Sequence, residues 1–219
     1  MQKLGYISKE EDLNPDRLAR VYSEQAASLA YSHDAMNAFQ RGVKRVTDFV
    51  CALLGLVILF PVFLVIALIM IIQKNGPVLF AQERIGYGGK PFTIYKFRTL
   101  STVVEDEGPQ LVAKSDSVKS TKFERFLREH HIDELPQLWN VLVGDMSLVG
   151  PRPERKYFIN QIMEHTHDYE LIYQMRPGLT SEATLYNGYT YTMEKMLKRL
   201  DMDIRYLSTV LLALTRKSS

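Results

Sequence analysis

The sequence predicts an α+β fold that is mainly α: a small cytoplasmic helical domain with a short β-ribbon, anchored by a membrane helix that is broken at a proline. Three features indicate this class: a 24-residue run without charge over 49–72, two short strand patterns around a Gly-rich turn, and apolar positions with helical spacing after residue 121. We expect three parts: an N-terminal polar and amphipathic helical segment over 1–43, a membrane-embedded broken helix over 44–73, and a cytoplasmic domain over 74–219.

The composition excludes several classes of protein. Of the 219 residues, 46% are hydrophobic and 24% are charged, as in ordinary folded chains and unlike disordered ones. The net charge of +2 is not typical of polyanion binding, and no nucleic-acid-binding module is recognisable, so we expect no nucleic acid partner. A single cysteine, Cys51, excludes a disulfide within the chain and a multi-cysteine metal site.

The first 40 residues are polar and favour helix. Asn14, Pro15 and Asp16 are typical of a helix start, with asparagine as the N-cap and proline in the first turn. No short apolar stretch with a small-residue cleavage site is present, so we expect no secretory signal peptide.

The uncharged run over 49–72 predicts a membrane helix, because about 18 apolar residues already favour one over a buried core helix. Pro61 should kink or break it, leaving halves of about 18 Å that are each too short to cross about 30 Å of hydrocarbon. A helix that enters and leaves the same leaflet would keep both basic flanks in the cytoplasm. An ordinary kinked transmembrane helix is equally compatible with these patterns. The flanks are Arg41, Lys44 and Arg45 before the run and Lys74, Arg84 and Lys90 after it.

The rest of the chain alternates turns with short strand and helix patterns. Strands should flank a turn over 86–91, and the polar residues 101–120 should form an exposed loop. Pro136 suits the first turn of a helix, and Gly144 suits its end. Helices are expected over 121–129, 133–144, 154–175 and about 193–214.

The pair Asp133-Glu134 is the strongest candidate for chemistry. It lies where a helix should begin, and backbone N–H groups there favour negative charge. Adjacent carboxylates repel each other, which a bound Mg²⁺ would relieve, and a carboxylate can also act as a nucleophile toward phosphorus. The simpler interpretation is that Asp133 is a helix N-cap and Glu134 a first-turn acid. For the pair alone that interpretation is favoured, and only its surroundings can overturn it.

Those surroundings include cations in loops or at the ends of predicted elements. Arginine binds phosphate bidentately and stays charged, so a convergent set could hold a diphosphate, whereas a scattered set would be an ordinary solvated surface. The arginines at 152 and 176 adjoin prolines, and rigid loops of this kind position functional groups. The Gly-rich residues 86–89 lack the ending of a phosphate-binding loop and are better interpreted as a hairpin turn. The cations are Arg84, Lys96, Arg98, Arg128, Arg152, Arg155 and Arg176.

Four segments of the chain resemble a known family. They are KRVTDFVCALLGLVILFPVF, GPVLFAQERIGYGGKPFTIYKFRTL, FLREHHIDELPQLWNVLVGDMSLVGPRPE and RPGLT, and together they extend from about Lys44 to Thr180. The family is that of the bacterial sugar transferases, the monotopic polyprenol-phosphate phosphoglycosyl transferases that initiate surface-glycan assembly. The chain is similar to the small catalytic-core type, whereas longer members carry extra N-terminal membrane helices.

The resemblance implies an enzyme that transfers a phosphosugar from a nucleoside diphosphate-sugar, usually UDP-linked, to a membrane polyprenyl phosphate and releases UMP. It implies Mg²⁺ as the cofactor and a covalent phosphosugar intermediate on Asp133, with Glu134 supporting the metal site or proton handling. It places the catalytic domain, 74–219, on the cytoplasmic face of the bacterial inner membrane. The product would serve exopolysaccharide or lipopolysaccharide synthesis. Membrane lipids are expected partners, and members can form homodimers. The family's re-entrant helix, broken at a proline, matches Pro61.

Substrate phosphates are the expected ligands of five cations. Three match family positions linked to phosphates or to the active site: one in KFRTL, one five residues before the acidic pair and one in PRP. The other two come from the set of cations above. The five are Lys96, Arg98, Arg128, Arg152 and Arg176. The chain departs from the family at Glu124, where glycine is usual, at 116–119 and at 181–185, which leaves sugar specificity and C-terminal contacts open.

Two other functions compete with this enzyme. A catalytically silent membrane scaffold of glycan assembly would keep the fold but would need neither the acidic pair nor Arg152. A membrane-surface module could bind anionic lipid through the basic residues before the apolar run, but it would leave the downstream motifs unexplained.

Overall fold

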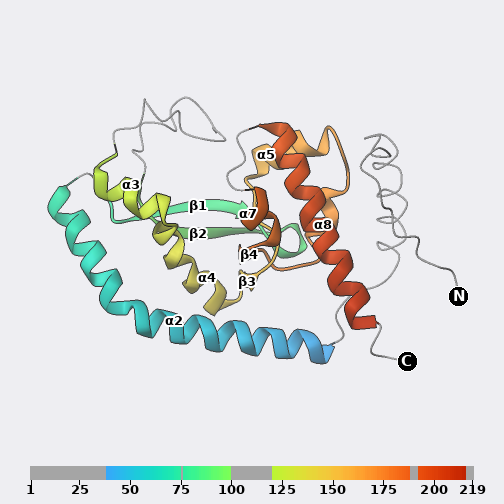
Figure 1. Cartoon of the computed structure of the whole chain (residues 1–219), viewed down its shortest axis with the longest axis horizontal. Helices are drawn as coiled ribbons and strands as arrows, with labels where there is room; N and C mark the ends of the chain where they lie inside the picture. The colour runs from blue at the N-terminus through green and yellow to red at the C-terminus, as the bar shows by residue number, and fades with distance from the viewer. Residues whose placement is uncertain (1–37, 75, 100–119, 188–191, 216–219) are drawn as a thin grey trace, which may run out of the picture. The chain divides into compact units, whose positions relative to one another are not determined.

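The computed structural model describes residues 38–74, 76–99, 120–187 and 192–215, all within one unit, 34–219. Helices dominate these residues and two sheets of two strands accompany them (Figure 1), which confirms the mainly α class with small β content. The helix start predicted at Asn14-Pro15-Asp16 and nearly all of the loop predicted over 101–120 lie outside the described residues. Those interpretations, and the division of the chain into three parts, stay predictions.

The apolar run forms helix α2 (Ala38–Gln73), 36 residues with Pro61 inside. Among the described residues, it is the one helix long and apolar enough to cross a membrane by length and composition. Only 11% of its most apolar 18-residue stretch is buried. Ile58 is 71% exposed and Ile72 is 68% exposed. Because a core helix of a soluble protein would be mostly buried, this exposure favours association with a membrane.

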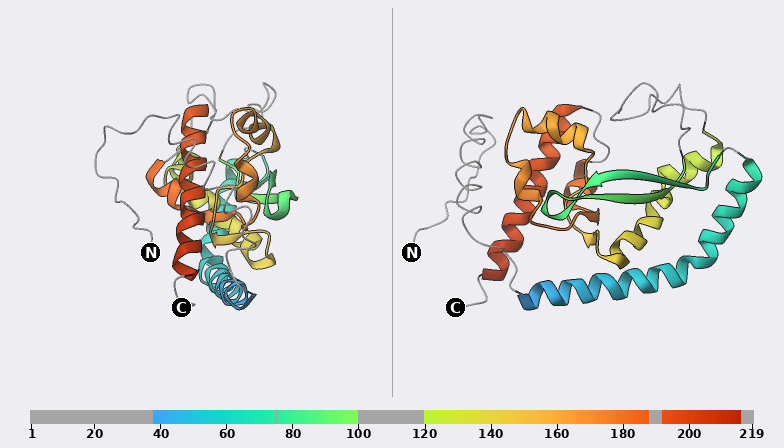
Figure 2. Two further views of the ribbon diagram at one scale, coloured as in Figure 1. Left: turned by 90° about the vertical axis from the view of Figure 1, so that its right-hand side faces the viewer. Right: turned by 180° about the vertical axis from the view of Figure 1, so that it is seen from behind.

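Helix α2 is continuous through Pro61 but bends partway along (Figures 1 and 2). A proline lacks the N–H of one helical hydrogen bond and crowds the preceding turn, which accounts for a bend without two separate helices. Both limbs pack on the rest of the unit. Ala52 on the first limb lies in a core cluster with Leu138, and Met70 on the second lies in another with Leu127.

Strands β1 (Leu79–Ile85) and β2 (Pro91–Phe97) form the predicted hairpin. They pair antiparallel, with Leu79 opposite Phe97 at one end and Ile85 opposite Pro91 at the other. A 3-10 turn, Tyr87–Gly89, joins them, and Gly88 in it has a φ of 66° that favours glycine. The Gly-rich segment is therefore a hairpin turn, as predicted.

The next helices begin with strong local signals. Helix α3 (Lys122–Glu129) starts with a capping box: Thr121 accepts the backbone N–H of Glu124, and Glu124 accepts that of Thr121. The segment after it was predicted to be an α-helix from Asp133, but it is a 3-10 helix, η4 (Ile132–Gln137), followed by α4 (Leu138–Val143). A 3-10 turn commonly opens an α-helix, and this one begins at Ile132 and contains Pro136, while Gly144 ends α4 at a φ of 99°.

A second sheet was not predicted. Strands β3 (Ser147–Val149) and β4 (Gly178–Thr180) pair in parallel. The backbones of Gly150 and Gly178 cross in close contact. A Cβ on Gly178 would collide with the backbone nitrogen of Gly150, so only glycine fits there. Three residues are too few to show a strand periodicity, so this pairing had no pattern in the sequence.

The C-terminal half is helical. The helix predicted over 154–175 is wrong in extent, because it is two helices, α5 (Lys156–Met163) and α6 (Tyr169–Ile172). Between them Thr166 accepts the backbone N–H of Asp168, a local turn that competes with helix. Helix α7 (Glu182–Asn187) follows, and α8 (Met193–Thr215) confirms the last predicted helix.

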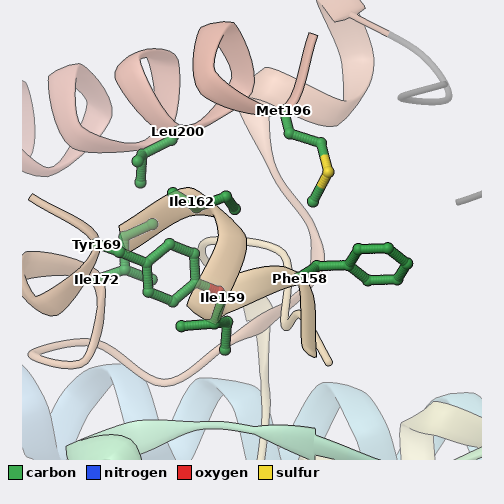
Figure 3. Close-up of a cluster of buried hydrophobic side chains, with 7 residues drawn as sticks. All are labelled: Phe158, Ile159, Ile162, Tyr169, Ile172, Met196 and Leu200. Carbon is green, nitrogen blue, oxygen red and sulfur yellow. The ribbon is translucent and has the colours of Figure 1, made fainter. Parts of the chain in front are cut away.

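Helices α5, α6 and α8 share one hydrophobic cluster (Figure 3). Side chains from the three helices meet in it, so α8 is held against the segment that follows β3. The cluster consists of Phe158, Ile159, Ile162, Tyr169, Ile172, Met196 and Leu200.

The glycine crossing gives a test of this fold. Gly178→Ala should lower the melting temperature by about 5 °C or more, because overpacking costs about 2 kcal/mol and each kcal/mol shifts a domain of this size by roughly 2–4 °C. Gly42→Ala is the control, since a Cβ there meets nothing within 4 Å and alanine favours helix. Thermal unfolding in detergent measures both, and equal melting temperatures would contradict the crossing.

Candidate active site

The acidic pair lies where strand β2, the 3-10 helix η4 and the loop after β3 meet. Asn140 joins α4 to β2: its side-chain amide donates to the Thr93 carbonyl at 2.7 Å and accepts the Tyr95 N–H at 3.3 Å. Asn140 is fully buried, so both bonds are shielded from water. The Asn140 side chain thus bonds to the backbone of β2 as a neighbouring strand would. This fixes the position of the acidic pair, which lies just before α4, relative to β2.

Asp133 is buried, with 7% exposed, and its carboxylate is poorly satisfied. Its Oδ2 accepts a long bond of 3.5 Å from the Thr99 hydroxyl, while its Oδ1 is buried without a hydrogen-bond partner among the described residues. Burial raises the pKa of Asp133, the charge of Lys96 lowers it in part, and the charge of Glu134 raises it further. The site therefore holds a carboxylate oxygen that is free to meet a ligand.

Glu134 is held in the opposite way. Its Oε1 accepts the Lys96 ammonium at 2.8 Å and the Arg152 guanidinium at 3.3 Å. Burial by itself would raise the pKa of Glu134, but the charges of Arg152 and Lys96 and their hydrogen bonds outweigh it and lower the pKa to about 2. Glu134 is therefore a fixed anion, next to an aspartate whose negative charge is disfavoured.

Two cations, Lys96 and Arg152, share the single carboxylate of Glu134, and Arg84 lies near them. Burial lowers the pKa of Lys96, and Arg152 and Arg84 add to the effect against the pull of Glu134. Burial together with the charges of Arg152 and Arg155 lowers the pKa of Arg84 to about 9. Crowded, buried positive charge of this kind favours the binding of an anion such as a phosphate.

The structure brings together some of the predicted phosphate ligands. Lys96 and Arg152 both contact Glu134, and Arg128 donates at 3.0 Å to the carbonyl of Thr99, the residue whose hydroxyl reaches Asp133. Thr99 was missed by sequence reasoning, because a lone threonine after a strand carries no pattern.

Two predicted ligands have other partners. Arg98 is buried, with an ion pair to Glu124 at 3.0 Å and a bond to the Pro77 carbonyl. Arg176 donates to the Gly144 carbonyl at 2.8 Å and stacks over the Tyr87 ring. Neither has a contact with the acidic pair in the structure, and their role in substrate binding stays a prediction.

The interpretation of Asp133 as an N-cap is wrong. His131 stands at the N-cap of η4, in the left-handed region with a φ of 56°, and no side chain caps this end. Both acids lie in the first turn of η4, and Glu134 pairs with two cations there, so a cap does not account for them.

The residues present fit a hard divalent cation. No group of three or more His, Cys, Asp or Glu side chains gathers in the part of the chain that the structure describes. Mg²⁺ typically takes only one or two carboxylates and fills its shell with water and substrate phosphates. The unpartnered Oδ1 of Asp133 beside Glu134 meets that requirement.

Comparison with known proteins gives the family. The model of the family described as bacterial sugar transferase matches residues 39–217. The chain is 38% identical over 174 residues to the UDP-glucose:undecaprenyl-phosphate glucose-1-phosphate transferase of Klebsiella pneumoniae, covering 78% of this chain and 37% of that protein. It is 43% identical over 169 residues to the protein of the same name in Caulobacter vibrioides, covering 76% and 62%.

A third relative carries a different sugar in its name. The UDP-N-acetylgalactosamine-undecaprenyl-phosphate N-acetylgalactosaminephosphotransferase of Aeromonas hydrophila is 34% identical over 165 residues, which cover 75% of this chain and 39% of that protein. The chain thus spans less than two fifths of the Klebsiella and Aeromonas relatives. From the match over 39–217 and these identities, the chain belongs to the bacterial sugar transferase family.

Proposed function

We propose that this protein transfers a phosphosugar from a nucleoside diphosphate-sugar, a UDP-sugar, to a membrane polyprenyl phosphate and releases UMP. The names of the relatives support the donor and acceptor classes. The observation that carries the proposal is the contrast between two adjacent acids. Asp133 has a buried oxygen without a hydrogen-bond partner, and two cations hold Glu134 in place. The relatives differ in sugar, so the donor sugar is left to experiment.

The reaction proceeds in two displacements at one phosphorus. An Asp133 carboxylate oxygen attacks the phosphorus that carries the sugar, and the bond from that phosphorus to the UMP oxygen breaks. UMP leaves, and an acyl phosphate links Asp133 to the sugar phosphate. An oxygen of the polyprenyl phosphate then attacks the same phosphorus and releases the Asp133 carboxylate, giving a polyprenyl diphosphate-sugar.

The cations supply positioning and charge neutralisation, which phosphoryl transfer mainly requires. Lys96 and Arg152 hold Glu134 and present their remaining N–H groups to the donor phosphates. Asp133 and Glu134 would hold Mg²⁺, which neutralises charge on the phosphates when bound. Poor hydrogen bonding leaves Asp133 a better nucleophile than Glu134, whose pKa is near 2.

The proposed location is the bacterial inner membrane, with the catalytic domain on the cytoplasmic face and α2 re-entrant. Both limbs of α2 bond to the same domain. Arg45 on the first limb donates to the Val141 carbonyl at 2.6 Å, and Gln73 at the far end accepts the Thr121 hydroxyl at 3.3 Å. A bent helix that contains Pro61 and has both ends tied to one domain supports entry and exit on one side.

A silent scaffold is the second candidate, and Asp133 disfavours it. A buried carboxylate without full hydrogen bonding destabilises the fold. A scaffold has no reason to keep it, whereas a nucleophile has.

The first prediction concerns turnover. Purified protein in detergent, with Mg²⁺, polyprenyl phosphate and a panel of UDP-sugars, should release UMP with at least one sugar. Asp133→Asn should lower the rate by about 10³-fold or more, because an amide cannot replace the carboxylate nucleophile. Asp201→Asn is the matched control, since that half-exposed aspartate pairs with Arg205 on α8.

Two outcomes would contradict the proposal. Lipid-dependent UMP release by Asp133→Asn at the wild-type rate would exclude the covalent intermediate. Folded wild-type protein that releases no nucleotide with any donor would favour the scaffold.

The second prediction concerns stability. Because burial disfavours the Asp133 charge, Asp133→Asn should raise the melting temperature in metal-free buffer by about 2–4 °C, the shift that roughly 1 kcal/mol gives in a domain of this size. Differential scanning fluorimetry measures it, with Glu134→Gln as the contrast. Removing the Glu134 charge leaves Lys96 and Arg152 unpaired, so that variant should melt lower. A lower melting temperature for Asp133→Asn would show that the carboxylate is stabilising.

The third prediction concerns topology. After Cys51→Ala, single cysteines at Phe39→Cys and Lys90→Cys report the two sides of the apolar run. In intact spheroplasts a membrane-impermeant maleimide should label neither, and after permeabilisation it should label both. Labelling of one site in intact spheroplasts would mean that α2 spans the membrane.

A further inference from the structure

The loop that carries Arg152 is held at its backbone from two strands. The Pro151 carbonyl accepts the Gly178 N–H at 2.9 Å, at the start of β4. The Glu154 carbonyl accepts the Ile85 N–H at 3.1 Å, at the end of β1. Prolines at 151 and 153 have no N–H of their own, so the Arg152 N–H is one of few backbone donors in this loop.

That donor lies beside Asp203 of helix α8. The Arg152 backbone N–H, the Ser181 hydroxyl and the charge of Arg199 each lower the pKa of the Asp203 carboxylate against the effect of burial, so all three groups lie close to it. Asp203 is 4% exposed, so these groups meet in a dry setting. A residue 51 positions further along the chain is thereby placed against the Arg152 backbone.

A second contact joins α8 to the same loop. Arg199, one helical turn before Asp203, donates to Oε1 of Glu154. The other oxygen of Glu154 pairs with Arg84 at 3.5 Å. Glu154 is thus clamped between β1 and α8, next to the residue whose guanidinium reaches Glu134.

These buried charges contribute little to the stability of the fold. Taking charges out of water costs more than a surface ion pair returns, and apolar side chains of similar size often serve stability as well. Burial raises the pKa of Asp203 to about 6 even though Arg199, the Arg152 backbone N–H and the Ser181 hydroxyl lower it. A role in orientation accounts for them better than a role in stability does.

We propose that Asp203 and Arg199 of α8 are positioning residues for the reaction, holding the Pro151–Glu154 loop so that the Arg152 guanidinium meets Glu134 and the donor phosphates. This rests on the proposed function for its kinetic consequence, but the hold itself is a separate property of the protein. Neither residue touches the substrate in this proposal, since both act through Arg152.

The hold is tested first without activity. Hydrogen–deuterium exchange of the full chain in detergent follows peptides that cover residues 150–155. Asp203→Leu removes the acceptor and should speed exchange in these peptides about tenfold, because a freed amide opens locally. Asp201→Leu, the same change on the other side of α8, should leave exchange at the wild-type level. Unchanged exchange in Asp203→Leu would overturn the proposal.

Kinetics then separate positioning from a general structural effect. Asp203→Leu should lower kcat about tenfold, since small misplacement of a phosphate ligand has large effects on rate. Asp203→Asn should recover to within about threefold, because its amide oxygen can accept the same N–H. In an Arg152→Lys background, Asp203→Leu should have almost no further effect, as expected for residues that act as a unit. Additive losses, or Asp203→Asn as slow as Asp203→Leu, would overturn the proposal.

Two further arms keep the result decisive. If Asp203→Leu does not fold, Arg199→Met tests the second contact by the same exchange and kinetic measurements, and wild-type exchange at 150–155 in that variant would overturn the proposal. If wild-type protein releases no UMP, the proposed function fails while the exchange arm still decides whether α8 holds the loop.

Discussion

The site depends on the contact between one Glu134 oxygen and two cations. Lys96 comes from strand β2, Glu134 from the 3-10 helix η4 and Arg152 from the loop after β3, so this single oxygen joins three segments. A buried charge with its partners removed costs several kcal/mol, typically 3–5. The three segments are therefore held in one arrangement, and Asn140 reinforces it by bonding to the backbone of β2.

The neighbouring Asp133 shows what that arrangement leaves open. Glu134 takes both cations, so Asp133 is left with a long bond to Thr99 and a buried oxygen without a partner. Two adjacent acids with opposite environments can have different roles, one as a fixed anion and the other as a reactive group. Some stability is given up at Asp133, as is common where a group is kept for its chemistry.

The acidic pair lies close to the apolar helix α2. Leu138 begins α4 directly after η4 and packs against α2, where a Cβ on Gly55 would lie 3.2 Å from its side chain. The acidic pair therefore lies only a few residues before Leu138, which contacts the helix that exposes most of its apolar surface. In the proposed reaction, a soluble donor and a lipid acceptor would meet at such a place without either crossing the bilayer.

Several features were determined by the sequence itself, because their causes are local. The capping box at Thr121 and Glu124, the glycine turn of the hairpin and the uncharged run of α2 each depend on residues within one element. The acidic pair and its flanking cations were also recognisable as residue types in a familiar block. Their residue types were predictable, but their contacts were not.

The tertiary structure alone decided which cations contact the acidic pair. Lys96 and Arg152 reach Glu134, while Arg98 turns to Glu124 and Arg176 to the end of α4, although the sequence shows all four only as cations in loops or near the ends of elements. The pairing of β3 with β4, across some 30 residues, likewise left no periodicity in three-residue strands. Long-range partners and burial determine the energy of a charge or a short strand, and neither is present in the pattern of neighbouring residues.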